Sequence, residues 1–482
     1  MKKILAAIMI LLLCGCGAAP AVSGPTDPLT LAMTGKLSAG AVEALPLASE
    51  KMTKDQLRQL CIAYFDLQLS FQWTPSRSVT DYPHTYANVE KTLDAGSVYG
   101  GIPYQSLGTG NLYRWLEYYD EATGVFDIDR AIAENGGDAV TSVERDENGN
   151  ITYYRYRWMR ALFNQCSVSS FWGWGRVINS AHFAWTSEMN VHNGFIPVGG
   201  YTYGYTYNGT YYGPEDIVRF GDRNAQYNPL GYDTKDVIRD WKAARGEDAM
   251  LRCYTQMQPA DCLVSGGHAM MVREVNLYYN EDGSVNYRRS TVTVLEQTEG
   301  WGTESELSGI PYKIQGANSA TYTLLYLQSK DYIPFTFAEF LEDDDPRLAN
   351  FTTSVPDCYQ TFSPESGPAV EPGAVYASVE GNTDFSGFQT MVVGANYPIS
   401  DVYVTVTDSA GKEVHRVFHR TEDAGTREVP MSAVRASYEM EGGKVLRLYD
   451  GLAEFTGHTV KVELRLSTGQ LLTAYEGKLT GA

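Results

Sequence analysis

The sequence predicts an α+β protein with an all-β C-terminal domain, and three observations lead to this fold class. Apolar residues recur at helical spacing between residues 53 and 72, and an apolar, aromatic stretch covers residues 166–179. Short runs with strand character then dominate between residues 262 and 326. After residue 375 the chain alternates apolar and polar residues in short strands, as a small β-sandwich does.

Composition excludes several classes of protein. The 482 residues are 43% hydrophobic and 20% charged, which is typical of a globular chain. The formal net charge of −20 repels nucleic-acid phosphate, so we expect no nucleic-acid partner. Seven cysteines are too few for a disulfide scaffold in a chain of this length. We expect no cofactor and no metal, because the chain lacks a Walker A sequence and zinc-type histidine spacing.

The first residues have the pattern of an export signal. Lys2 and Lys3 precede an apolar run from Ile4 to Leu13, which is shorter than the roughly 20 residues that span a bilayer. The Leu-Cys-Gly-Cys sequence that ends at Cys16 resembles a bacterial lipobox. The resemblance implies a protein lipidated on Cys16 and anchored to the extracytoplasmic face of the membrane.

The predicted signal peptide covers residues 1–15, and residues 16–50 are expected to be a flexible tether rich in Ala, Gly, Ser and Pro. The alternative is a plain signal peptide that is cleaved near Ala19 or Ala21.

Helices are expected in the first half of the chain. Thr53 and Gln56 form a capping box that opens a helix, which should run to Gln72 and end before Pro75. Further helices are predicted over residues 111–119, 127–134 and 166–179. Residues 151–158 are expected to form either a strand or the start of a helix.

Residues 191–232 form a tyrosine-rich insertion. Tyrosine recurs at every second position from Tyr201 to Tyr207, which predicts a hairpin with one aromatic face. Four strands are expected after the insertion, over residues 262–264, 269–275, 290–296 and 321–326. A turn is predicted at residues 280–283. Residues 356–374 form a Pro- and Gly-rich linker, and residues 375–482 are the predicted sandwich domain.

One cysteine and one histidine occupy positions suited to catalysis. Cys166 opens an apolar helix, whose N-terminal dipole favours the thiolate and whose first N–H groups lack intrahelical acceptors. His268 directly follows a Gly-Gly turn and starts an apolar strand, which fixes it as a general base requires. A polar residue at the end of the next strand, Glu296 or Gln297, is then suited to orient the imidazole.

These stretches resemble the NlpC-type cell-wall cysteine peptidases and the related CHAP amidases. The resemblance covers residues 164–176 and 259–299, and extends loosely to residues 99–104. It implies that residues 51–355 form a papain-like fold, in which the helix carrying the cysteine packs on an antiparallel sheet. It also implies a nucleophile at Cys166 and a base at His268.

The same resemblance assigns the third catalytic role to Glu296. Tyr104, Gln165, Tyr203 and Tyr205 are expected to contact substrate. The sequence departs from the family pattern at three places: Gln165 replaces an aspartate, Ala260 replaces the glycine before Asp261, and Thr298 replaces an asparagine.

The expected function is therefore that of a lipid-anchored cysteine hydrolase that cleaves an amide bond in peptidoglycan, as an endopeptidase of stem peptides or as an amidase. Its expected partners are peptidoglycan or muropeptides and, through the lipid, the membrane. The alternative is a non-catalytic lipoprotein that binds the cell wall or a partner on a degenerate papain-like fold. An acyltransferase that uses the same cysteine and histidine is a third possibility.

Overall fold

The computed structural model describes most of residues 52–298 and the principal segments beyond them. The described residues are 47–48, 52–81, 91–105, 107–178, 183, 185–186, 189, 195–200, 205–207, 210–212, 235, 238–239, 242–243, 246–298, 316–345, 348, 375–378, 391–440, 444–447 and 455–479. The predicted signal peptide, Cys16, nearly all of the tether and the linker at 356–374 lie outside them. No helix among the described residues is long and apolar enough to cross a bilayer.

Helix α4 spans Lys54–Ser70 and begins with the predicted capping box. Thr53 Oγ1 accepts the Gln56 N–H at 3.2 Å, and Gln56 Oε1 accepts the Thr53 N–H at 2.8 Å. The helix ends two residues earlier than predicted, because the chain continues into strand β1 (Gln72–Pro75).

Three short helices follow α4. They are α5 (Leu112–Leu116), α6 (Ile128–Glu134) and α7 (Arg157–Leu162). Asn111 and Asp127 cap α5 and α6 by accepting main-chain N–H groups, as their residue types favour. Both predicted alternatives for residues 151–158 are present, since strand β8 (Ile151–Tyr156) leads directly into the start of α7.

Small sheets accompany these helices. One four-stranded sheet has the order β4-β1-β6-β5, and two hairpins pair β2 with β3 and β7 with β8. The remaining bounds are β2 (Val79–Asp81), β3 (Lys91–Leu93), β4 (Tyr99–Gly100), β5 (Tyr119–Asp120), β6 (Val125–Phe126) and β7 (Val140–Arg145).

The main sheet has six strands in the order β15-β14-β13-β12-β16-β9, and every neighbouring pair is antiparallel. Its strands are β9 (Ile196–Pro197), β12 (Cys262–Ser265), β13 (His268–Asn276), β14 (Thr291–Thr298), β15 (Gly316–Thr323) and β16 (Ile333–Thr336). The predicted turn at 280–283 is present, with Gly283 at φ 82°. Helix α10 (Ala249–Tyr254) precedes β12.

The predicted strand at 321–326 is wrong beyond Thr323. The Thr323 hydroxyl accepts the Tyr326 N–H at 3.2 Å and so caps helix α11 (Leu324–Ser329). The β-branched and aromatic residues favour a strand locally, but this cap turns the chain into a helix.

The tyrosine-rich insertion contains the predicted hairpin, formed by β10 (Tyr205–Tyr207) and β11 (Thr210–Tyr212). The predicted aromatic face depends on side chains that lie outside the described part of the structure.

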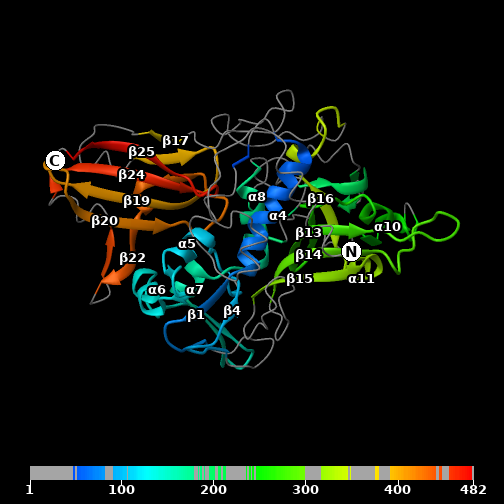
Figure 1. Ribbon diagram of the computed structural model, residues 1–482, viewed down its shortest axis with the longest axis horizontal. Helices are drawn as coiled ribbons and strands as arrows, with labels where there is room; N and C mark the ends of the chain where they lie inside the picture. The colour runs from blue at the N-terminus through cyan, green and yellow to red at the C-terminus, as the bar shows by residue number, and fades with distance from the viewer. Residues whose placement is uncertain are drawn as a thin grey trace.

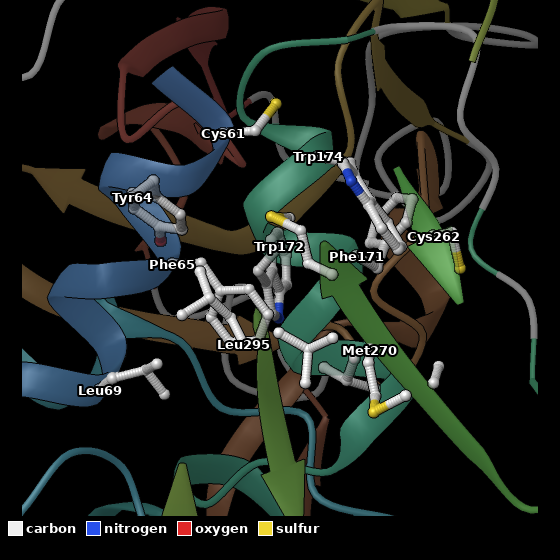
Figure 2. Packing of buried hydrophobic residues seen from close by; sticks show 14 of the residues in the cluster. Cys61, Tyr64, Phe65, Leu69, Phe171, Trp172, Trp174, Cys262, Met270 and Leu295 are labelled. Atoms are coloured by element: carbon white, nitrogen blue, oxygen red, sulfur yellow. The ribbon is translucent and has the colours of Figure 1, made fainter. Parts of the chain in front are cut away.

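Helix α8 (Cys166–Gly175) lies at the centre of the core, and all ten of its residues are buried. It ends four residues earlier than predicted. It packs against α4 on one side and against β13 and β14 of the main sheet on another. Figure 2 shows Phe65 of α4, Trp172 of α8 and Leu295 of β14 among the side chains of this cluster. The aromatic residues of α8 are therefore core residues, which explains why so apolar a helix is stable here.

Residues 375–479, called the C-terminal region below, are rich in strands. One sheet has the order β17-β18-β21, a second has the order β20-β19-β24-β25, and β22 pairs with β23. The strands are β17 (Val375–Ser378), β18 (Val392–Ala395), β19 (Ile399–Thr407), β20 (Glu413–Arg420), β21 (Glu428–Pro430), β22 (Arg435–Met440), β23 (Lys444–Arg447), β24 (Thr459–Leu466) and β25 (Leu471–Lys478). The two larger sheets share one buried apolar cluster.

The C-terminal region packs directly on the rest of the protein, and α4 and α8 lie between its sheets and the main sheet (Figure 1). Arg114 of α5 is fully buried and donates to Asp401 Oδ1 at 3.1 Å. It also donates to the main-chain oxygens of Ser400 and Thr421, at 2.6 and 3.0 Å. Arg420 donates to the same Asp401 oxygen at 2.8 Å.

A second group of contacts reaches the C-terminal end of α8. The Ser467 hydroxyl donates to the main-chain oxygen of Gly175, the last residue of that helix. Arg176 donates to the Thr468 oxygen, which also accepts the Tyr113 hydroxyl at 3.0 Å. The turn between β24 and β25 thus fixes the end of the helix that Cys166 begins.

Candidate functional site

Cys166 is the first residue of α8, and Gln165 is its N-cap with an extended backbone. The first intrahelical bond runs from the Ser169 N–H to the Gln165 oxygen at 2.8 Å. Cys166 is 7% exposed, and its sulfur accepts backbone N–H groups of Ser167 and Ala269. Main-chain N–H groups at the start of α8 and at the start of β13 therefore both point at the sulfur.

His268 is the first residue of β13 and follows the two-residue Gly266-Gly267 turn. It pairs with Ser265 of β12 in the antiparallel register. The side chain is 21% exposed, and its Nε2 lies 2.6 Å from Glu296 Oε2. Its ring also forms a hydrogen bond with the Cys166 thiol. Because Nε2 is engaged by Glu296, Nδ1 is the nitrogen left for the sulfur.

Glu296 lies on β14, the strand next to β13, and its side chain is 4% exposed. One carboxylate oxygen bonds His268 and the other accepts the Tyr322 hydroxyl at 2.8 Å. Gln297 points away from this group, and its amide donates to the Ile102 oxygen at 2.7 Å. Of the two residues that the sequence leaves open for the third role, the structure brings Glu296 to His268.

The electrostatics of the site favour a thiolate beside an imidazolium. Burial alone would raise the pKa of the Cys166 thiol, but the hydrogen bond and the charge of His268 outweigh it, so this pKa lies below its usual value. Burial also opposes the charged form of His268. Its hydrogen bonds and charge interactions with Cys166 and Glu296 nevertheless raise the pKa of the imidazole to about 10. Both shifts favour the ion pair, in which a thiolate nucleophile lies next to a proton donor.

The residues before Cys166 run beside the segment at 101–105. Tyr104 forms a parallel bridge with Asn164, and the Gln105 N–H donates to the Asn164 oxygen at 2.8 Å. Gln165 Oε1 accepts the Leu107 N–H at 3.2 Å. Its amide nitrogen is buried and has no hydrogen-bond acceptor. Gln165 directly precedes Cys166, and Tyr104 is bridged to Asn164, two residues before Cys166.

Ala260 has a backbone conformation that usually requires glycine. Its φ is 68°, in the left-handed region, while its N–H donates to the Val272 oxygen at 2.7 Å. The resemblance expects glycine at this position. The next residue, Asp261, is buried against Arg58 of α4, with 2.7 Å between Oδ1 and Nη1. The Ala-Asp pair therefore positions the start of β12.

The other predicted residues fall outside this group. Tyr203 lies outside the described residues, and of Tyr205 only its place in β10 is described. Thr298 ends β14 opposite Gly316. Within the described residues, no three His, Cys, Asp or Glu side chains gather as metal ligands would.

Sequence reasoning missed Tyr322. It lies on β15, in register with Val292 of β14. A tyrosine within a predicted strand next to the Glu296 strand was the available signal, but the register of the two strands was needed to bring the hydroxyl to the carboxylate.

No protein-family model, curated protein or solved structure matches this chain.

Proposed function

We propose that the protein is a cysteine hydrolase that cleaves an amide bond through Cys166, His268 and Glu296. The observation that carries the proposal is the continuous hydrogen-bonded group of a helix-start thiol, an imidazole and a buried carboxylate. A structural core cysteine has no need of such partners. Cys61 and Cys262 are examples, because burial raises the pKa of each of these two thiols.

The proposed reaction has two steps, acylation of Cys166 and hydrolysis of the thioester. The Cys166 thiolate attacks the carbonyl carbon, and the developing oxyanion faces the N-terminus of α8, where main-chain N–H groups lack intrahelical acceptors. His268 then gives its Nδ1 proton to the leaving nitrogen as the C–N bond breaks, which leaves a thioester on Cys166. Water attacks the thioester while His268 accepts a water proton, and the thiolate leaves as the carboxylic acid forms.

Glu296 keeps the imidazole in place during both steps, because its carboxylate bonds the nitrogen that faces away from the sulfur. The unpaired amide nitrogen of Gln165 is a candidate second donor to the oxyanion, since it is buried directly before the nucleophile. Tyr104 is a candidate substrate contact on the neighbouring segment.

The proposed substrate is peptidoglycan, as the resemblance to NlpC-type and CHAP proteins implies. The packing of α8 on an antiparallel sheet supports a papain-like fold. The two sheets that share a core in the C-terminal region support an Ig-like sandwich. The lipobox resemblance at Cys16 adds a lipid anchor at the extracytoplasmic face of the membrane.

The first prediction concerns the nucleophile. Purified peptidoglycan is incubated with the protein, and the released muropeptides are identified by mass spectrometry. We expect Cys166→Ala to reduce release by about 10³-fold or more, since loss of a nucleophile removes the covalent route. Product masses identify the scissile bond.

Cys253→Ala is the matched control, because Cys253 is also a buried thiol of the same region and lies on α10. It should leave release close to that of the parent protein. Undiminished release by a folded Cys166→Ala protein would exclude the cysteine mechanism, and binding of peptidoglycan without any release would point to a non-catalytic binding protein.

A further inference from the structure

We propose that Tyr322 is a positioning residue of this site: its hydroxyl holds the Glu296 carboxylate in the orientation that bonds His268. The inference rests on the proposed function, which it extends from three residues to four. Tyr322 touches neither the sulfur nor the reacting bond, and it acts on Cys166 only through Glu296 and then His268.

The carboxylate of Glu296 has one partner for each oxygen. Oε2 lies 2.6 Å from His268 Nε2, and Oε1 accepts the Tyr322 hydroxyl at 2.8 Å. With Glu296 only 4% exposed, water has little access to replace either bond. Within the described part of the chain His268 and Tyr322 are the side-chain partners of Glu296, so removal of the hydroxyl leaves the buried Oε1 atom without a donor.

Tyr322 is itself held by two rigid elements. Its main chain pairs with Val292 in the sheet, and its ring stacks on Tyr326 of α11, with 4.8 Å between centroids and 9° between planes. The Thr323 cap sets the start of α11 and hence the place of Tyr326. A phenylalanine at 322 would keep the ring and the stack and would lose only the hydroxyl.

The same stack provides a matched control. Tyr326 is 41% exposed and has no hydrogen bond from its hydroxyl among the described contacts, so Tyr326→Phe removes a hydroxyl from the other ring of the stack without touching Glu296. A general effect of weakening this surface would appear in both variants, whereas an effect through Glu296 would appear in Tyr322→Phe alone.

The test measures the reactivity of Cys166 directly, so that it does not depend on the substrate. Iodoacetamide is reacted with the full protein, and adducts on each cysteine are quantified against time by mass spectrometry. We expect Tyr322→Phe to slow alkylation of Cys166 about tenfold at neutral pH, as loss of a hydrogen bond to a charged group does. Tyr326→Phe should react at the parent rate.

A double-mutant cycle with Glu296→Gln separates positioning from a structural role. With the carboxylate removed, the further change Tyr322→Phe should alter the rate by less than about twofold. NMR supplies a readout that is independent of rate: the His268 Nε2–H resonance should shift in Tyr322→Phe and stay in place in Tyr326→Phe.

Each other outcome overturns the inference. Unchanged Cys166 reactivity in Tyr322→Phe excludes the positioning role while leaving the proposed function intact. An equal tenfold loss in the Glu296→Gln background means that Tyr322 acts by another route. If Cys166 of the parent protein reacts no faster than the buried thiols Cys61 and Cys262, the proposed function fails and the inference fails with it.

Discussion

At the scale of single residues, the pKa shifts at Cys166 and His268 determine how the site responds to pH. The thiol pKa lies below its usual value and the imidazole pKa is raised to about 10, so the ion pair exists in the range between the two. Below this range the thiolate takes up a proton. Above it the imidazolium loses the proton that it would give to the leaving nitrogen in the proposed reaction.

Two pH profiles should therefore differ. Alkylation of Cys166 needs only the thiolate, so the midpoint of its pH profile should lie below the value of 9.0 for an ordinary thiol. Amide hydrolysis also needs the imidazolium, so it should decline again near pH 10. Iodoacetamide kinetics and muropeptide release, each measured across pH, check the two limbs.

His268→Ala is the control for this prediction. Without the imidazole, burial is left as the largest influence on Cys166, and the alkylation midpoint should move to the alkaline side of an ordinary thiol. A parent midpoint near 9, unchanged in His268→Ala, would show that the two residues are not coupled.

The three residues with local sequence signals were predictable one by one. Cys166 precedes an apolar run, His268 follows Gly-Gly, and Glu296 ends an apolar strand. Each signal depends on neighbours in the chain. Tyr322 lacked such a signal, because its relation to Glu296 depends on the pairing of two strands and on the ring stack beneath them.

At the scale of elements, caps and turns were predicted well because a few residues in sequence determine them. Thr53 caps α4 as expected, and Gly283 occupies the predicted turn. Helix ends were predicted less well. Helix α8 ends at Gly175, whose main-chain oxygen accepts a hydrogen bond from Ser467 of the C-terminal region. The residues near position 175 carry no sequence signal for this long-range hydrogen bond.

The turn between β24 and β25 gives an element-scale prediction. Gly469 has φ 87°, and a Cβ at this position would overlap the ring of Tyr113 on α5. Gly469→Ala should therefore cost at least about 2 kcal/mol of unfolding free energy, from the left-handed backbone and the overlap together. Urea unfolding monitored by circular dichroism measures the loss.

Gly411→Ala is the matched variant, because Gly411 also has a positive φ, 79°, and a Cβ there would meet nothing within 4 Å. It should cost about 1 kcal/mol, which is the backbone cost alone. Equal losses for the two variants would mean that the contact between the turn and α5 contributes nothing to stability.

At the scale of the whole molecule, a buried ionic network holds the C-terminal region against the rest of the protein. Asp401 is fully buried and accepts hydrogen bonds from Arg114 and Arg420. Burial opposes its ionisation, but these two guanidinium groups hold the pKa of Asp401 well below its usual value. Because the folded pKa is depressed, the stability that this carboxylate contributes is present above the unfolded value and is lost as pH falls through the folded one.

Arg114→Met should destabilise the protein by about 3–5 kcal/mol, since it removes one partner of a buried ionic network. Arg160→Met is the control: Arg160 pairs with Glu422 at 3.4 Å across the same two regions, but the glutamate side chain is 78% exposed. That change should cost less than about 1 kcal/mol. Urea titrations of both proteins make the comparison, and similar losses would contradict the importance of the buried network.

Sequence could not predict this attachment. An arginine in a short helix is usually a surface residue, and the acceptors of Arg114 in the C-terminal region lie 286 to 307 residues further along the chain. The sequence patterns predict two separate units, but the pattern within each unit does not indicate which of its faces contacts the other unit.

The long sequence separation between Arg114 and its acceptors in the C-terminal region also affects the order in which parts of the protein fold. During synthesis the part of a chain that leaves the ribosome first usually folds first. The hydrogen bonds that join Arg114 of α5 and the end of α8 to residues 400–468 can form only after those residues have been made. The helix that begins with Cys166 therefore reaches its final packing only when translation is almost complete.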